Sequence, residues 1–413
     1  MTISSDWIAK EQKYYAQTVR RQPVVIVRGE GTRVWDADGK EYLDFVAGWA
    51  VNNLGHSHPV ITQAIVEQAG TLLQTSNQFY TVPQLQLAEI LIENSCLDQV
   101  FFGNSGAEAS EVMFKLARRL GQAEGRFEII TAENSFHGRT MAGISASGQK
   151  KLKDGFAPLL EGFAHVPYND IDAVRSAITP ATMAVMIEGI QGEGGIRPAS
   201  AEYLLGLRAL CDERNLLLLW DGVQCGHFRT GSFQSFQAIL GDQIGDFLPD
   251  AVGMAKALGG GFPMGAVWIS EKHADVLGPG THGSTFGGNP LACAVANKIL
   301  EVIDRDGLAA NARALGQFFL DELAKLREKY PTAIREVRGL GLMIGIEMGG
   351  GFGSFDNSKP AAVQWVFALH EAGLLTIPAG SSVVRFLPPL NLTQEEAQAG
   401  LDLFEQTIQK VIE

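Results

Sequence analysis

The sequence lacks the signals of a secreted or membrane-bound protein. Its cysteines are few and widely spaced, at Cys96, Cys211, Cys225 and Cys293, with no C-x-x-C pair. This spacing indicates reduced thiols and argues against a disulfide framework or a zinc site. No apolar run reaches the length of about 18 residues that a membrane span needs, and the N-terminal stretch MTISSDWIAKEQKYY has no apolar segment. We therefore expect a cytoplasmic protein with no membrane partner.

The sequence is also short of basic residues, with 33 Lys and Arg against 46 Asp and Glu and a formal net charge of −13. This balance disfavours a nucleic acid or another polyanion as a partner, although a local basic pocket is compatible with it. With 413 residues and 46% hydrophobic content, the chain is longer than one compact hydrophobic core usually accommodates. We expect two domains, or one large domain with a smaller satellite.

The middle of the chain alternates short apolar runs with amphipathic segments. The runs that indicate strands are QVFFGN, FEIITA, AVMIEGI, LLLLWD and GAVWIS, and helical patterns lie at 106–121, 201–214 and 288–304. Strands buried on both faces and separated by helices predict an α/β fold with a parallel sheet covered on both sides. In such sheets ligands bind beyond the carboxyl ends of the strands, so the polar residues that end each run are candidates for a site.

Both ends of the chain differ from this pattern. The first ~45 residues contain short strands joined by Gly-containing turns. After about residue 305 come two strand-like stretches, IREVRGLGLMIGIEM and VVRFLPPL, and helical patterns at 361–373 and 394–411. We therefore predict a smaller α+β domain built from segments 1–50 and 305–413, and a large domain over 51–304.

Small residues follow the strand VFFGN and lead into a helix. Ser105, Gly106 and Ala107 leave backbone N–H groups free at the helix start, which suits a phosphate, although an ordinary helix cap has the same pattern. Ser284 and Thr285 precede another helix start in the same way. Both stretches are candidates for binding phosphate oxygens.

Two further loops follow strands and carry groups that could recognise a ring or a charge. The loop TAENSFHGRT contains Phe136, His137 and Arg139, which suit a flat ring and a carboxylate; a surface loop with an incidental aromatic residue is the alternative. The loop VMIEGIQGEGGIRP contains Glu188 and Glu193, which are either solvated loop charges or partners of cations in a cleft.

The most apolar strand, LLLLWD, ends on Asp221, with Gln224 close behind. A carboxylate there requires a cation or a hydrogen-bond donor, unless Asp221 is only a turn or cap residue. Lys256 lies among Ala, Met, Leu and Gly residues, and it is either an ordinary surface lysine or a desolvated nucleophile that can form an imine. An imine-forming lysine, an aspartate for a ring nitrogen, an aromatic ring and N–H groups for a phosphate together describe a pyridoxal phosphate site.

A resemblance to a known family rests on the motifs NSGAEA, SFHGRT, QGEGG, D-x-V-Q, AKALGGGFPMGA, STFGGNPLACA and RFLPPL. From about residue 15 to the C-terminus the chain is similar to the class III aminotransferases of the fold type I pyridoxal-phosphate enzymes. The resemblance implies a large domain with a mostly parallel seven-stranded sheet flanked by helices, and a smaller α+β domain from both termini. Other stretches, VNNLGHSHP, TSNQFYT, GQKKLKDGFAPL and VPYND, are most similar to the subfamily that acts on N-acetylornithine.

The resemblance also implies how the cofactor would be held. Lys256 would bind pyridoxal phosphate covalently and move the reacting proton, Asp221 would pair with the pyridine nitrogen, and Gln224 would contact the phenolic oxygen. The other cofactor-binding residues would be Ser105, Gly106, Ala107, Phe136, His137, Glu188 and Thr285. Because Thr285 would serve the cofactor of a neighbouring subunit, a homodimer is the smallest unit that the resemblance allows.

Substrate binding would fall to Arg139, Arg385, Glu193 and Ser284. The arginines resemble carboxylate-binding forks, and Glu193 resembles the residue that masks Arg385 while the amino donor is bound. The implied reaction moves the terminal amino group of N-acetylornithine to 2-oxoglutarate, giving N-acetylglutamate semialdehyde and glutamate. The rivals are a transaminase for ornithine, succinylornithine, 4-aminobutyrate or another ω-amine, a decarboxylase or mutase with the same cofactor, and a catalytically silent binding protein.

Three residues depart from the family pattern. Gly222 stands where a second acid is usual, Gly189 where proline is usual, and Phe228 where glycine is common. We expect the two glycines to loosen a loop beside the cofactor, and we interpret Gly222 and Phe228 as one linked repacking that leaves Asp221 in place. Two other patterns are rejected: GLGLMIG has the wrong spacing for a dinucleotide loop, and the histidines of GHSHP lack a third metal ligand.

Overall fold

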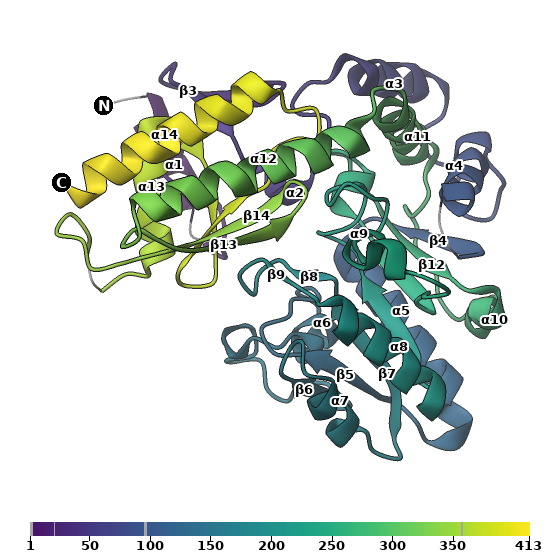
Figure 1. The fold of residues 1–413 in the computed structure, drawn as a ribbon. Coiled ribbons are helices and arrows are strands. Elements are labelled where there is room, and N and C mark those ends of the chain that lie inside the picture. The colour runs from purple at the N-terminus through teal and green to yellow at the C-terminus, as the bar shows by residue number, and fades with distance from the viewer. Residues whose placement is uncertain (1–2, 20, 95–96, 357) are drawn as a thin grey trace.

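The computed structural model describes residues 3–19, 21–94, 97–356 and 358–413 (Figure 1). Its largest sheet has seven strands in the order β4, β12, β11, β10, β7, β5 and β6. Neighbouring strands are parallel except at β12, which runs antiparallel to both β11 and β4, so the predicted mostly parallel sheet is confirmed. The strands are β4 (Gln99–Gly103), β5 (Glu128–Ala132), β6 (Phe163–Val166), β7 (Thr182–Glu188), β10 (Leu217–Asp221), β11 (Ala251–Met254) and β12 (Gly265–Ile269).

The central position of β10 in the sheet explains why its residues before Asp221 are all apolar. Leu217 and Leu219 pack in one core cluster with helix α5 (Gly106–Gly121), whereas Leu218 and Trp220 pack in another with α8 (Ala201–Arg214). Successive side chains of a strand point to opposite faces, so a strand covered by helices on both sides needs apolar residues at every position. Figure 1 shows these helices on the two sides of the sheet.

The predicted helices in this region are present. Those expected at 106–121 and 201–214 are α5 and α8, and the one expected at 288–304 is α11 (Pro290–Arg305). The sequence analysis missed β6 and β11, because four residues are too few to show a periodicity. The remaining helices are α2 (Ala47–Ala50), α3 (Pro59–Thr71), α4 (Val82–Asn94), α6 (Met141–Ala146), α7 (Ile171–Ala177), α9 (Ser235–Leu240) and α10 (Glu271–Ala274).

A smaller α+β region is built from both ends of the chain, as predicted. One sheet has the order β13, β14, β17 and β16, and a second has the order β1, β2, β3 and β15. Strand β15 pairs in parallel with β3, so the two ends of the chain share a sheet. The strands are β1 (Ile26–Glu30), β2 (Arg33–Asp36), β3 (Glu41–Asp44), β13 (Ile334–Leu340), β14 (Met343–Met348), β15 (Leu374–Leu375), β16 (Ile377–Ala379) and β17 (Val383–Phe386).

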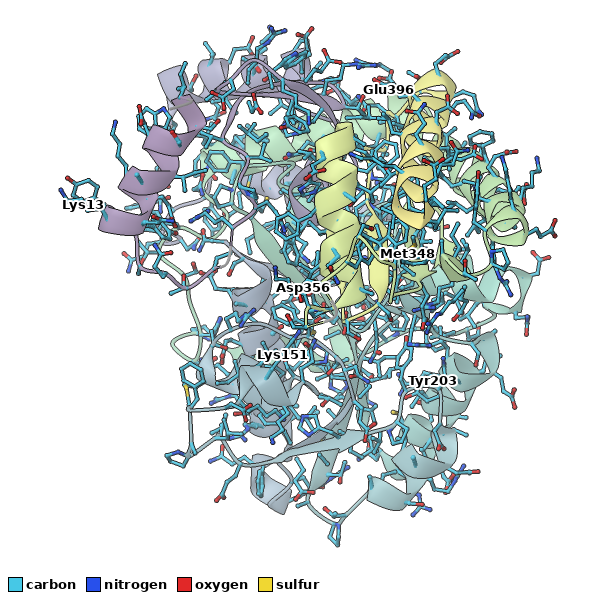
Figure 2. The ribbon with its side chains drawn as sticks, turned by 90° about the vertical axis from the view of Figure 1, so that its left-hand side faces the viewer. Lys13, Lys151, Tyr203, Met348, Asp356 and Glu396 are labelled. Atoms are coloured by element: carbon cyan, nitrogen blue, oxygen red, sulfur yellow. The ribbon has the colours of Figure 1, made fainter. Side chains whose placement is uncertain are left out.

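Four helices accompany these sheets. The predicted helices at 361–373 and 394–411 are α13 (Ala361–Ala372) and α14 (Gln394–Ile412), and the sequence analysis did not predict α1 (Ile3–Tyr14) and α12 (Leu308–Lys329). Figure 2 shows α1 at the margin of the molecule, with the Lys13 side chain pointing away from it. The boundaries at residues 51 and 304 stay a prediction.

The structure also shows where the cysteines and the two rejected motifs lie. Cys211, Cys225 and Cys293 are buried free thiols, and Cys96 lies outside the described residues. The stretch GLGLMIG forms part of the β13–β14 hairpin. His56 hydrogen-bonds through Nε2 to the carboxylate of Asp44 at 2.7 Å. No helix in the described part of the chain is long and apolar enough to cross a bilayer.

Candidate active site

A cavity of about 400 Å³ lies at the carboxyl ends of the parallel strands. Most of its wall comes from the segments at the ends of β4, β5, β7, β10 and β11, and Val51 adds a sixth stretch of the chain. Of the predicted site residues, only Arg385, Ser284 and Thr285 lie outside its lining. The lining contains Ser105, Gly106, Ala107, Phe136, His137, Arg139, Glu188, Glu193, Asp221, Gln224 and Lys256.

One wall of the cavity is the N-terminus of α5. Ser105 is the N-cap, and its Oγ accepts a hydrogen bond from the Glu108 N–H at 3.2 Å. A Cβ at Gly106 would lie 2.8 Å from Val223 Cγ1, so a side chain there would collide with the neighbouring wall. The first N–H groups of a helix have no partner within it, and the helix dipole favours an anion. This wall can therefore hold a phosphate.

The carboxylate of Asp221 is held by two donors at the end of β10. Its Oδ2 lies 2.8 Å from His137 Nδ1, and its Oδ1 accepts from the Val223 N–H at 3.1 Å. Burial lowers the pKa of His137, but the hydrogen bond and charge of Asp221 outweigh burial, so the pKa is raised above its ordinary value. A carboxylate has further acceptor sites, so Asp221 can still accept a proton donor from the cavity.

Glu188 connects two loops of the site. Its Oε1 accepts from the Phe136 N–H and its Oε2 from the Gly192 N–H, both at 3.0 Å. Burial raises the pKa of Glu188 to about 7, with His137 acting in the opposite direction. The Phe136 ring lies 5.6 Å from the guanidinium of the exposed Arg139. Glu188 thus fixes the backbone beside the aromatic ring instead of facing solvent.

Lys256 follows β11 and faces the same cavity. Its backbone has φ +45°, a left-handed conformation that non-glycine residues adopt at a cost and often at functional sites. Burial lowers the pKa of its amine, and the nearby Glu193 carboxylate opposes this shift. Among the described residues, none is hydrogen-bonded to this amine, so it is available to a ligand.

Arg385 lies on β17 and closes the end of the site that faces the smaller region. Its side chain is fully buried, and Nη1 donates to Glu193 Oε1 at 2.9 Å and to Gln224 Oε1 at 3.0 Å. The Trp49 ring lies 5.0 Å from its guanidinium. The sequence analysis missed Trp49, which sits in the left-handed turn of α2 with φ +70°; its only signal was an aromatic residue directly after Gly48.

Ser284 and Thr285 do not reach the cavity within this chain. Ser284 Oγ accepts from Asn104 Nδ2 at 3.0 Å, and Asn104 itself lines the cavity, so Ser284 supports its rim. Thr285 is exposed on the surface.

The structure packs other side chains closely against Gly189 and Gly222, and the expectation that these glycines loosen a loop stays a prediction. A Cβ at Gly189 would lie 2.3 Å from Trp220 Cζ2, and one at Gly222 would lie 2.8 Å from Gln234 Oε1. Neighbouring side chains therefore occupy the space that these glycines leave. Phe228 has φ +65°, the region that glycine favours, and it lies 5.4 Å from the Phe233 ring.

Comparisons with known proteins agree with this geometry. The family model for class-III aminotransferases matches residues 14–408. The acetylornithine aminotransferase of Methanocaldococcus jannaschii is 46% identical over 411 residues, 98% of each chain. The structure of acetylornithine aminotransferase from Elizabethkingia anophelis has a TM-score of 0.85 at 36% identity, covering 99% of this chain and 100% of that one. A Toxoplasma gondii ornithine aminotransferase with partial PLP occupancy has a TM-score of 0.91 at 35% identity, with coverages of 100% and 96%.

Proposed function

The chain belongs to the class-III aminotransferases, and from that premise we propose that it moves the terminal amino group of N2-acetyl-L-ornithine to 2-oxoglutarate. The products are N-acetyl-L-glutamate 5-semialdehyde and L-glutamate. The observation that carries the proposal is the ion pair of the buried Arg385 with the partly exposed Glu193, beside the cavity that contains Lys256. A carboxylate-binding arginine that an internal acid can mask suits an enzyme that alternates between a dicarboxylate and an ω-amine.

Pyridoxal phosphate is the cofactor, and the residues of the cavity fit it. The α5 N-terminus has backbone donors suited to its phosphate, and a side chain at Gly106 would collide with Val223 on the neighbouring wall of the cavity. The Phe136 ring is suited to one ring face, and the unpartnered Lys256 amine to the aldehyde carbon. When bound, the cofactor supplies an aldehyde that bonds to amines and a ring that accepts electrons from the reacting carbon.

Lys256 and Asp221 would act on the reacting atoms. Because burial lowers the pKa of the Lys256 amine, more of it is neutral near pH 7 and able to bond covalently or to take a proton. Asp221 would keep a proton on the pyridine nitrogen, and the His137 and Val223 donors hold its carboxylate in place. Gln224 would contact the phenolic oxygen, while its Oε1 also accepts from Arg385.

The substrates are small molecules, and three side chains would discriminate between the amino donor and the dicarboxylate. Arg385 and Arg139 would bind the two carboxylates of 2-oxoglutarate or glutamate. Glu193 would return to Arg385 when the donor, which brings an amine in place of the second carboxylate, occupies the site. Ser284 would act indirectly, through Asn104 at the rim of the cavity beside the α5 N-terminus.

We further propose a cytoplasmic homodimer in which Thr285 serves the cofactor of the other subunit. Asn77 Nδ2 donates to Ser284 O at 2.8 Å and Gly287 O at 2.9 Å, so the segment around Asn77 lies against the segment that carries Thr285. Both segments expose large apolar groups, and a patch of this kind marks an interface. These groups are Val66, Leu72, Leu73, Phe79, Tyr80, Val82, Leu85 and Phe286.

A panel of amino donors with 2-oxoglutarate tests the proposed reaction, with glutamate formation as the readout. The donors are N-acetylornithine, N-succinylornithine, ornithine and 4-aminobutyrate at equal concentrations. We expect the highest kcat/KM with N-acetylornithine. A clear preference for 4-aminobutyrate or for ornithine contradicts the proposed donor and leaves the aminotransferase assignment in place.

A further inference from the structure

We propose that Arg338 is a positioning residue that sets how firmly Glu193 masks Arg385, and so sets the balance between the two substrates. The inference rests on the proposed function. Arg338 faces neither the cavity nor Lys256, and it acts through the loop that carries Glu193.

Three residues form a row across the smaller sheet. The strand register pairs Arg338 of β13 with Gly345 of β14, and Gly345 with Arg385 of β17. Residues that are directly opposite on neighbouring antiparallel strands share one face of the sheet. The row therefore presents a guanidinium, a position without a side chain, and a second guanidinium on the same face.

The loop that follows β8 (Ile190–Gln191) is seated on this row. Glu193 pairs with Arg385 at 2.9 Å, and the Gly195 carbonyl accepts from Arg338 Nε, also at 2.9 Å. Between these contacts, a Cβ at Gly345 would lie 2.7 Å from Ile196 Cβ, so the glycine leaves the space that Ile196 fills. The same sheet thus holds both Arg385 and the loop whose acid masks it.

The guanidinium of Arg338 is itself held in place by the sheet. Nη1 donates to Glu336 Oε2 at 2.7 Å and to Glu347 Oε2 at 2.8 Å, and the side chain is only 9% exposed. Two carboxylates on one side and a carbonyl on the other use the planar fork of arginine, which a lysine cannot reproduce. Arg338 therefore fixes the position of Gly195 relative to the smaller sheet.

Glu193 depends on this support because the structure gives its carboxylate one hydrogen bond, to Arg385. If Arg338 no longer holds Gly195, the loop has more freedom and Glu193 spends less time on Arg385. A dicarboxylate then binds more tightly, because the Glu193 carboxylate competes with it less strongly for Arg385. The enzyme then discriminates less in favour of the ω-amine donor, because the unmasked Arg385 also binds the side-chain carboxylate of glutamate.

The test is calorimetric titration of the cofactor-loaded enzyme with glutarate, a dicarboxylate that carries no reacting group. We expect Arg338→Met to bind glutarate about three- to tenfold more tightly than the wild type, which is the size of effect seen for residues that act through a neighbour. Arg338→Lys keeps the charge without the fork and should shift the affinity in the same direction. Arg335→Met is the matched control, because Arg335 lies on the same strand and is exposed; it should not change the affinity.

The Glu193→Gln background separates positioning from a general loss of structure. When masking is already removed, Arg338→Met should have no further effect on glutarate affinity. An unchanged affinity for both Arg338 variants in the wild-type background, or a loss of affinity in both backgrounds, overturns the inference. Failure of N-acetylornithine in the donor panel is a separate result, since glutarate binding does not involve the donor.

Discussion

The two ends of the cavity hold their acidic side chains differently. At the end formed by the seven-stranded sheet, the Asp221 and Glu188 carboxylates each have two hydrogen-bond donors. At the end that faces the smaller sheet, the Glu193 carboxylate has one donor among the described residues. Asp221 is fixed by His137 and Val223, and its side chain is 5% exposed. Within the described residues, the Glu193 carboxylate has one hydrogen-bond donor, Arg385, and its side chain is 21% exposed. The first arrangement resists movement, and the second allows it.

This difference matches what the two ends have to do. A cofactor that stays in place through both halves of a transamination needs a charge that does not move. Two substrates that differ in charge at one end need an acid that can leave and return. Removing a group at the Asp221 end should therefore impair both half-reactions, and removing Glu193 should alter one more than the other.

The largest effect is expected from Lys256→Ala, which removes the amine between the two ends. Turnover should fall by at least about 10⁴-fold, because the covalent and proton-transfer roles are lost together. Glutamate formation measures this loss, and borohydride treatment followed by peptide mass analysis measures covalent attachment of the cofactor. Lys272→Ala, a change at an exposed lysine, is the control. Cofactor that is still attached after borohydride in Lys256→Ala would contradict the assignment.

Asp221→Asn tests the fixed end directly. The amide removes the negative charge, and we expect both half-reactions to slow by a similar factor of about 10³. Rapid-mixing kinetics with N-acetylornithine and with 2-oxoglutarate measure each half separately. Asp250→Asn is a matched control, because Asp250 pairs with Arg208 at 2.9 Å and is absent from the cavity lining. Slowing of only one half-reaction would remove the contrast with Glu193.

How much of this site was visible in the sequence depends on how far apart its partners lie. Ser105 follows one predicted strand and Asp221 ends another, so the rule that parallel strands end at one edge brought these two together. Lys256 follows β11, which was not predicted, and it was singled out by its apolar neighbours in the sequence. The bond from His137 to Asp221 joins residues 84 positions apart and was not predicted. The pair of Arg385 with Glu193 joins residues 192 positions apart and was expected only from the family resemblance. No local pattern encodes such contacts.

The fold shows the same limit. The helices α5 and α8 were predicted from their periodicity, whereas the four-residue strands β6 and β11 and the long helix α12 were missed. The row of Arg338 and Arg385 depends on strand register, which sequence periodicity leaves undetermined. The space beside Gly189 and Gly222 is likewise filled by side chains from other parts of the chain, which no local pattern predicts.

The pH dependence of stability should reveal the buried acid at the fixed end. Burial raises the pKa of Glu188 to about 7, so the folded protein holds this proton more tightly than the unfolded chain. Its stabilising contribution is complete below the unfolded pKa and is lost as the pH rises through about 7. Between pH 5 and 8 the melting temperature of the wild type should therefore fall by about 2 °C more than that of Glu188→Gln. Equal slopes would place the Glu188 pKa near its ordinary value.

The smallest effect is expected from Phe228→Gly, which tests the linked repacking beside the fixed end. The change relieves a left-handed backbone worth about 1 kcal/mol but loses the packing of a half-buried ring on Phe233, so the free energy of unfolding should fall by about 1 kcal/mol. Turnover should stay within about twofold, because the ring does not touch the donors that hold Asp221.

The other half of that repacking is Gly222. Phe233 is followed by Gln234, whose Oε1 fills the space that a side chain at Gly222 would need, so Gly222→Glu should leave turnover unchanged or lower it. A strong rise in turnover from Gly222→Glu alone would show that the missing acid limits catalysis, and the linked-repacking hypothesis would then fail. A loss of turnover in Phe228→Gly would place that ring in support of Asp221, and the fixed end would extend beyond its two direct donors.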